Sequence, residues 1–257
     1  MEDLFTLFVI VGFLAQIVDG ALGMAYGVVS SSVLLAFGVP PAAASASVHA
    51  AELFTTAASA TSHVWHRNVN WRLFLRLAPA GIAGGVLGAY AITAMDGNAL
   101  RPWVAAYLGL MGLYILYRGL RDIRPVDHHR SAVVLPLGAV GGFMDAVGGG
   151  GWGPVVTTGL IGSGGNPRQM IGTVNTVEFF LTAAVSAAFL TALLSGHWEE
   201  AEGLASHLWP VLGLILGGVA AAPLAGYVTR ILPVRILTLI VGVLIVALSV
   251  WQIARLI

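Results

Sequence analysis

The feature that most constrains the fold of this chain is a series of long apolar stretches with few charges between them. Several reach the ~20 residues that an α-helix needs to cross ~30 Å of hydrocarbon. Only 9% of the residues are charged and 58% are hydrophobic, whereas soluble domains average about 25% charged residues. Because a soluble fold could not bury so much apolar surface, the sequence predicts an all-α polytopic membrane protein. The stretches cover residues 4–18, 22–37, 41–63, 73–94, 100–117, 132–145, 151–163, 169–195, 208–229 and 233–254.

The second half of the chain repeats the first. Residues 19–60 align without a gap with residues 145–186. Apolar membrane segments match leucine and valine by chance, but they do not readily match acids, prolines and glycines in register. We therefore predict two transmembrane repeats, 1–117 and 131–257, joined by a linker, 118–130. The matched pairs include Asp19 with Asp145, Gly23 with Gly149, Gly27 with Gly153, Pro41 with Pro167, and Glu52 with Glu178.

Each repeat has about five helical segments, and we expect the first two of each to be short helices around a glycine-rich break. The breaks have the sequences VDGALG at 18–23 and MDAVGGGGWG at 144–153. Arginines concentrate in the loop 66–76 and in the linker 118–130, which predicts that both are cytoplasmic. An odd number of segments inverts the second repeat relative to the first, as in many secondary transporters. If each short pair is a single span, the repeats are parallel instead.

Four carboxylates lie within otherwise apolar segments: Asp19, Glu52, Asp145 and Glu178. An aspartate at the centre of a membrane helix costs about 3 kcal/mol, so such residues usually face a cavity or a partner. Asp19 and Asp145 each precede a break, where the alternative is that they cap the following helix. Capping does not explain Glu52 and Glu178 in the middle of their helices, which favours substrate binding or proton relay.

The glycine-rich breaks, taken over GALGMAYG at 20–27 and AVGGGGWGP at 146–154, are the second group of candidates. Glycine permits close approach of the backbone, and a helix that begins inside the membrane directs N–H groups and a partial positive charge at what precedes it. This arrangement suits an anion, and nearby hydroxyls add donors. The alternative is close helix packing by small residues, which we expect for Gly84–Gly85 and Gly217–Gly218. The candidate residues are Gly23, Ser31, Gly149, Gly150, Gly151, Trp152 and Thr157.

His49 and Asn175 occupy equivalent positions, three residues before Glu52 and Glu178. Each therefore shares a helical face with its glutamate and is a candidate for binding substrate oxygens. The alternative is an interhelical hydrogen bond. His49 and the four carboxylates would also suit a divalent cation.

Several motifs resemble those of the sulfite exporter TauE/SafE family of membrane permeases. They are G-x-x-x-x-x-x-D-G-x-x-G at 12–23, G-V-P-P at 38–41 and D-A-V-G-G-G-G-W-G at 145–153, with G-x-N-P-R at 164–168 and G-T-x-N at 172–175. The resemblance covers nearly the whole chain. It implies a bacterial protein of roughly eight spans that moves small sulfur oxyanions or organosulfonates. His49 departs from the family pattern, which often has threonine or asparagine there.

We therefore predict a secondary transporter in the cell inner membrane, not an enzyme, that moves a small anion such as sulfite or sulfoacetate. The chain contains no lysine, so it lacks the phosphate-binding G-x-x-x-x-G-K-[ST] motif of ATP-driven pumps. The acids would repel an anion unless protonated, and burial favours the neutral form of a carboxyl group, so we expect coupling to protons through Glu52 and Glu178.

The expected partners are a small anionic substrate, a coupling proton and the lipid bilayer. A net charge of zero gives no basic surface for nucleic acid, and we expect no cofactor and no resident metal. The sequence leaves a homodimer open. A carrier of divalent metal or another cation, using the membrane carboxylates and His49, is the alternative function.

Overall fold

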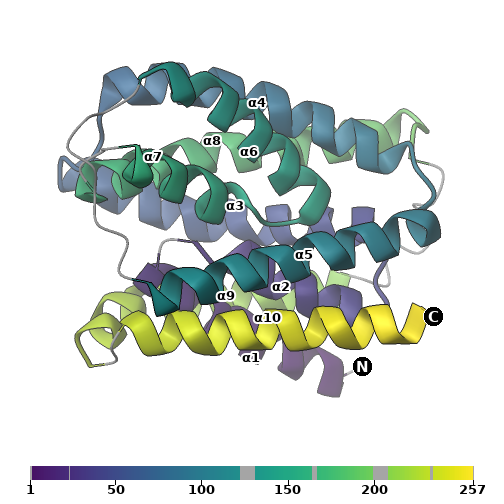
Figure 1. Ribbon diagram of the computed structural model, residues 1–257. Coiled ribbons are helices and arrows are strands. Elements are labelled where there is room, and N and C mark those ends of the chain that lie inside the picture. The colour runs from purple at the N-terminus through teal and green to yellow at the C-terminus, as the bar shows by residue number, and fades with distance from the viewer. Residues whose placement is uncertain are drawn as a thin grey trace.

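The computed structural model describes residues 2–22, 24–121, 131–163, 167–198, 208–231 and 234–256. Helices account for nearly all of these residues, and no strand occurs among them. The expected all-α architecture is confirmed (Figure 1).

The two halves of the chain contain matching series of elements. The first half consists of α1 (Glu2–Leu22), α2 (Tyr26–Ala36), α3 (Pro41–Trp65), α4 (Trp71–Thr93) and α5 (Gly97–Leu120). The second half begins with a short 3-10 turn, η1 (Ser131–Val133), and α6 (Val134–Gly148). It continues with a π-helical turn, η2 (Gly153–Thr157), and then α7 (Thr158–Gly162), α8 (Pro167–Leu194), α9 (Leu208–Ile231) and α10 (Val234–Leu256). Residues 122–130 of the predicted linker lie outside the described residues.

Four helices in the described part of the chain are long and apolar enough to cross a membrane: Trp71–Thr93, Gly97–Leu120, Gln169–Leu194 and Thr238–Arg255. A helix of 23 residues is about 35 Å long, which exceeds the ~30 Å of bilayer hydrocarbon. At 11 residues, α2 is too short to cross. The first helix, α1, has 21 residues. It is therefore not the short helix that the apolar stretch 4–18 predicted.

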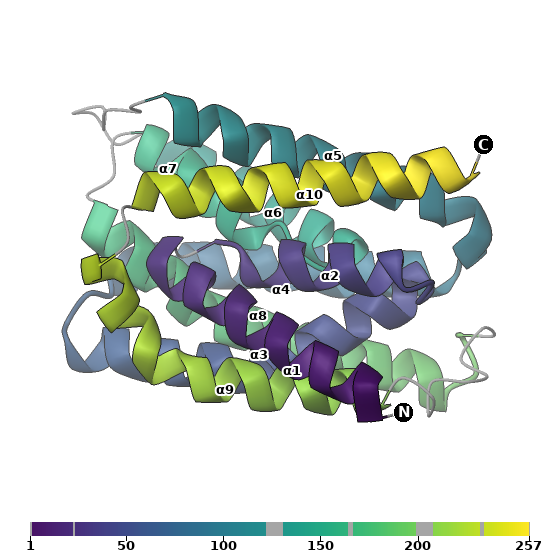
Figure 2. The same ribbon diagram turned by 90° about the horizontal axis from the view of Figure 1, so that it is seen from below.

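Helices of one half pack against helices of the other. The first helix of each half lies along the fourth helix of the opposite half, so α1 packs on α9 and α6 packs on α4. The two closing helices, α5 and α10, also pack together, and they run in opposite directions (Figure 1). Figure 2 shows the two chain termini at the same end of the bundle. The halves therefore share one core, with α3 and α8 in contact inside it.

Glycines allow the paired helices to approach closely. A Cβ atom on Gly84 of α4 would lie 2.0 Å from the carbonyl oxygen of Ala139 in α6, and one on Gly217 of α9 would lie 2.0 Å from that of Val9 in α1. Neither position can hold a larger side chain without separating the helices. This confirms the packing role expected for these glycines.

Candidate functional site

The two glycine-rich breaks meet in the interior of the bundle. A Cβ atom on Gly27 would lie 2.8 Å from the Cα of Gly150 and 2.9 Å from the carbonyl oxygen of Gly149. The φ angles of Gly149 and Gly150 are +63° and +157°, a region that side chains rarely adopt. Glycine is required here both by the backbone conformation and by the contact between the two breaks.

Each break is closed by its own aspartate. Asp19 Oδ1 accepts hydrogen bonds from the backbone N–H groups of Ala25 (2.8 Å) and Tyr26 (3.2 Å). Asp145 Oδ1 accepts one from the N–H of Trp152 (2.9 Å), which aligns with Tyr26 in the repeat. The capping interpretation is therefore confirmed for one oxygen of each aspartate. The expectation that helix-start amides are free for an anion is wrong for these three, because the protein itself supplies their acceptors.

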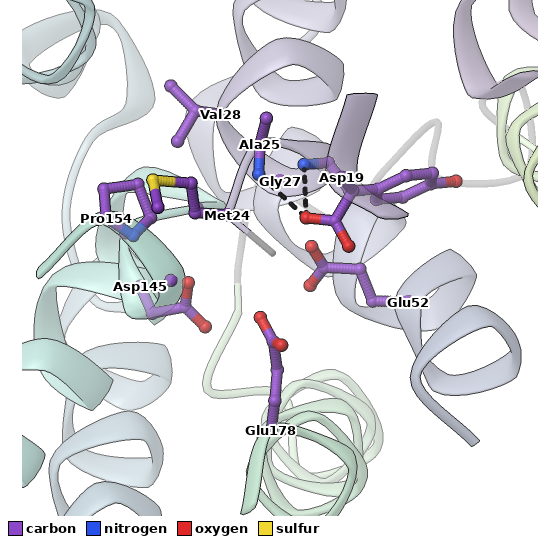
Figure 3. A pocket seen from close by; sticks show the side chains of 13 residues that line it. Asp19, Met24, Ala25, Gly27, Val28, Glu52, Asp145, Pro154 and Glu178 are labelled. Atoms are coloured by element: carbon purple, nitrogen blue, oxygen red, sulfur yellow. Dashed lines mark hydrogen bonds between the residues drawn. The ribbon is translucent and has the colours of Figure 1, made fainter. Parts of the chain in front are cut away.

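A pocket lies where the breaks meet, and all four candidate carboxylates line it (Figure 3). They come from four helices, since Asp19 ends α1, Glu52 lies in α3, Asp145 ends α6 and Glu178 lies in α8. The pocket encloses about 200 Å³ including the space at its mouth. The part that can hold the centre of a water molecule is only about 10 Å³, which is about the room that one water needs. The other lining residues are Met24, Ala25, Tyr26, Gly27, Val28, Gly150, Gly151, Gly153 and Pro154.

The carboxyl groups of Glu52 and Glu178 point into this pocket (Figure 3). Neither carboxyl group has a hydrogen-bond partner among the described residues, whereas the backbone carbonyl of Glu52 accepts from the Thr56 hydroxyl at 2.6 Å. The two carboxyl groups are therefore available to a ligand or a proton. In the described ranges, no three histidine or acidic side chains are arranged to hold a metal ion.

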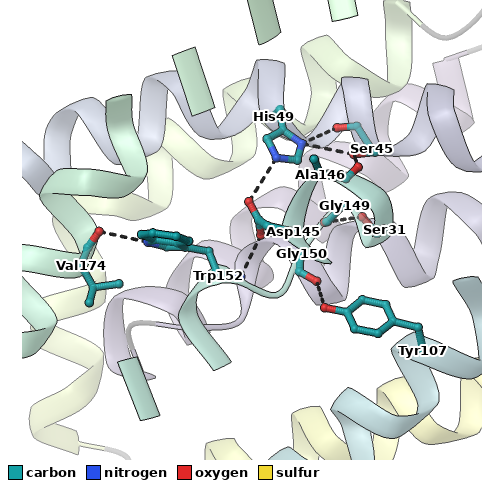
Figure 4. Close-up of polar contacts among 10 residues, drawn as sticks. All are labelled: Ser31, Ser45, His49, Tyr107, Asp145, Ala146, Gly149, Gly150, Trp152 and Val174. Carbon is teal, nitrogen blue, oxygen red and sulfur yellow. Dashed lines mark hydrogen bonds and ion pairs between the residues drawn. The ribbon is translucent and has the colours of Figure 1, made fainter. Parts of the chain in front are cut away.

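His49 reaches across to the break of the second repeat (Figure 4). Its Nε2 lies 3.2 Å from Asp145 Oδ2, and its Nδ1 lies 2.8 Å from the backbone carbonyl oxygen of Ser45. The side chains of His49 and Asp145 are 0% and 3% exposed, so water does not screen the charge of this pair. His49 thus contacts the aspartate of the site.

Hydroxyl groups fix the second break in place (Figure 4). Ser31 of α2 donates to the carbonyl of Gly149 at 2.5 Å, and Ser45 of α3 donates to that of Ala146 at 2.5 Å. Tyr107 of α5 donates to the carbonyl of Gly150 at 3.0 Å. Ser31 therefore positions the break, and because its hydroxyl hydrogen is used in this bond, it is not available to donate to a ligand. Three different helices satisfy carbonyls that the glycine turn leaves without helical partners.

Trp152 is fully buried and holds η2 against α8. Its indole Nε1 donates to the carbonyl of Val174 at 3.2 Å, and Gly81 leaves space for the ring, since a Cβ there would lie 2.6 Å from it. Thr157 is also buried, and its hydroxyl has no partner among the described residues.

One predicted site residue, Asn175, lies away from the pocket. The side-chain amide of Asn175 contacts Ser59 Oγ at 3.2 Å and His63 Nε2 at 3.3 Å, and Asn175 is not part of the pocket lining. Gly23 lies outside the described residues. The repeat-equivalent residues His49 and Asn175 thus have different partners.

Two residues at or beside the pocket were not singled out by sequence reasoning. Tyr26 lines it and donates from its hydroxyl to the carbonyl of Leu214 at 3.0 Å; its alignment with Trp152 was a usable signal. Arg118, near the end of α5, donates to Thr158 Oγ1 at 2.7 Å and to Met24 Sδ at 3.2 Å. No described carboxylate forms an ion pair with Arg118, and nothing in the sequence sets it apart from the other arginines near helix ends.

Comparisons with known proteins relate the chain to membrane transport proteins. The family model described as "Sulfite exporter TauE/SafE" matches residues 8–253. The chain is similar to "Probable membrane transporter protein YtnM" of Bacillus subtilis (strain 168), with 41% identity over 241 residues, covering 91% of this chain and 78% of the relative. No solved structure matches.

Proposed function

Because the chain belongs to the sulfite exporter TauE/SafE family, we propose that this membrane transporter is a proton-coupled secondary carrier of a small sulfur oxyanion or organosulfonate, such as sulfite or sulfoacetate. We place it in the bacterial inner membrane. The family and the relative named a membrane transporter support transport, and the pocket supports a small ligand.

The observation that carries the proposal is that two helix starts line one pocket. Ala25, Tyr26 and Gly27 come from the start of α2, and Gly153 and Pro154 come from the start of η2. The N-terminal end of a helix carries a partial positive charge, which favours an anion. Asp19 and Asp145 already accept hydrogen bonds from amides at these helix starts. Their negative charge offsets part of the positive potential that an anionic substrate would otherwise meet.

Negative charge on the pocket carboxyl groups opposes the entry of an anion. Two unit charges 4 Å apart repel by about 4 kcal/mol at an effective dielectric constant of 20, which would weaken anion binding about a thousandfold. We propose that Glu52 and Glu178 are neutral when the anion binds. Their lack of hydrogen-bond partners in the described residues leaves both open to protonation from the pocket.

Arg118 supplies a positive charge beside the pocket. Its guanidinium donates to Met24, a lining residue, and to Thr158. A thioether and a hydroxyl do not neutralise a guanidinium, so its charge remains available to attract an anion. We propose that it draws the substrate toward the pocket.

We also propose that the two repeats are inverted relative to one another. The antiparallel course of α5 and α10 (Figure 1) and the reciprocal pairing of α1 with α9 and of α6 with α4 support this relation. Inverted repeats place the binding site where the repeats meet and allow one repeat to rock against the other.

Uptake by purified protein in proteoliposomes tests the function. We expect saturable uptake of labelled sulfite, inhibition by sulfoacetate, and faster uptake when a proton gradient points in the same direction. Glu52→Gln should reduce the response to the gradient. Absence of uptake of every sulfur oxyanion and sulfonate, in both directions of the gradient, would overturn the proposal.

A carrier of divalent cations is the alternative that the sequence left open. Four carboxylates line the pocket, but among the described residues no three are arranged to hold a metal ion. It predicts saturable uptake of a divalent metal that sulfite does not inhibit and that Glu52→Gln abolishes. The same vesicles, loaded with a metal indicator, measure this directly.

A further inference from the structure

The hydrogen bonds of His49 specify where its protons lie. Nδ1 lies 2.8 Å from the carbonyl oxygen of Ser45, and a carbonyl oxygen only accepts, so Nδ1 must carry a hydrogen. The Ser45 hydroxyl is 3.4 Å from the same nitrogen, but it donates to the carbonyl of Ala146. Nε2 is therefore the nitrogen that changes protonation.

The contact between Nε2 and Asp145 Oδ2, at 3.2 Å, then requires a second proton. Without it, the lone pair of Nε2 would face the carboxylate lone pairs of Asp145 inside the protein. With it, the pair is either an imidazolium with a carboxylate or an imidazole with a carboxylic acid. The pair has no net charge in both forms, and loss of the proton leaves a net charge of −1.

This pair is distinct from the two glutamates but lies beside them. Asp145 lines the pocket and its other oxygen caps the glycine break through Trp152. A charge on the pair is therefore felt both by a ligand in the pocket and by the break. The titratable groups that face it are Glu52 on the same helix, Glu178 on α8, Asp19 at the end of α1 and Tyr107 on α5, while Phe189 of α8 packs beside the imidazole ring.

We propose that His49 and Asp145 together form a proton-binding site, and that the anion binds only while this proton is present. The inference rests on the proposed function and names a proton carrier for it. On release, the N–H bond of the imidazolium or the O–H bond of the carboxylic acid breaks, and the proton passes to water in the pocket. Linkage makes the effect reciprocal, so anion binding also strengthens proton binding.

The test is the pH dependence of sulfoacetate binding to the purified full-length protein, measured by calorimetry. Sulfoacetate stays ionised near neutral pH, so a change in affinity reports on the protein. We expect the Kd of the wild type to rise with pH, and this site to contribute up to about tenfold for each unit of pH once it loses its proton, which is the limit for one linked proton.

Asp145→Asn is the informative variant. Its amide oxygen still accepts from the Trp152 N–H and its amide nitrogen still donates to His49 Nε2, so both hydrogen bonds persist while the exchangeable proton is gone. We expect the pH slope of binding to fall by the share of one linked proton, and the ratio of uptake with and without a proton gradient to fall toward the part that Glu52 and Glu178 supply. His49→Asn, which introduces the residue found at the equivalent position of the second repeat, should have the same effect.

His66→Asn is the matched control. His66 directly follows the last residue of the same helix, α3, and its Nδ1 also contacts the carbonyl four residues earlier, Ser62, at 2.8 Å. It is exposed and has no carboxylate partner in the described residues. It should keep the wild-type pH slope of binding and the wild-type ratio of uptake with and without a proton gradient.

If Asp145→Asn and His49→Asn both keep the wild-type pH slope, the proton site is refuted, whereas the proposal of anion transport is not affected. Failure of the wild type to bind any anion would overturn the transport proposal itself. If the variants do not fold, nitrogen-15 NMR of the wild-type histidines and infrared difference spectra of its carboxyl groups decide. Anion binding that changes the protonation of neither His49 nor Asp145 would refute the site.

Discussion

Gly27→Ala tests the contact between the two breaks. The added Cβ would lie 2.8 Å from the Cα of Gly150, 2.9 Å from the carbonyl oxygen of Gly149 and 2.9 Å from Oε1 of Glu52. Ordinary contacts at such positions begin at 3.4 Å, so the breaks must separate by 3.4 − 2.8, or about 0.6 Å. Two of the three atoms belong to the backbone and cannot move away alone.

Overpacking of this kind costs about 1–3 kcal/mol. If that cost falls on the pocket, the affinity for the anion drops about 5- to 150-fold, because 1.4 kcal/mol corresponds to a factor of ten. The assays are sulfite uptake in proteoliposomes, which gives KM, and denaturant unfolding in detergent, which gives the free energy of unfolding.

Gly38→Ala is the control for this variant. Gly38 has a φ of +86° but nothing within 4 Å of the position of its Cβ. The substitution should cost about 1–2 kcal/mol of stability through backbone strain without changing KM. A Gly27→Ala protein with both KM and stability of the wild type would refute the close contact of the breaks.

Three further predictions concern single contacts. Asp19→Ala removes the acceptor for the amides of Ala25 and Tyr26 and should lower the free energy of unfolding by about 1 kcal/mol, whereas Asp19→Asn should recover most of it; equal losses in denaturant unfolding would contradict the capping role. Trp152→Phe removes the indole N–H donor and should lower the free energy of unfolding by about 1 kcal/mol in the same assay. An unchanged free energy of unfolding would show that this hydrogen bond does not stabilise the fold. Arg118→Gln should raise KM for the anion severalfold and weaken its dependence on ionic strength, and an unchanged KM in uptake assays would exclude the proposed attraction.

The sequence predicted the helices and the lining acids well, because both depend on strong local signals. The stretch 73–94 corresponds to α4, Trp71–Thr93, since apolar runs of that length have few alternatives in a membrane. The repeat alignment paired Asp19 with Asp145, and the structure brings both to one pocket. Acids in apolar helices are costly, so their positions were informative before any fold was known.

Contacts across the bundle could not be predicted in this way. His49 and Asn175 are equivalent in the alignment, yet His49 contacts Asp145 and Asn175 contacts His63. The alignment gives the position of each residue on its own helix, but the partner depends on which helix of the other half packs there. Arg118 contacts residues 94 and 40 positions away, and no local pattern encodes contacts at that separation.

The most direct test of the account is to locate a bound anion. Selenite resembles sulfite and scatters X-rays anomalously, and the chain has no cysteine to reduce it. In crystals grown with selenite, we expect one anomalous peak in the pocket between the starts of α2 and η2, beside Glu52 and Glu178. Selenite that is transported and inhibited by sulfite, but whose peak lies away from both glycine breaks, would contradict the proposal that their meeting point is the anion site.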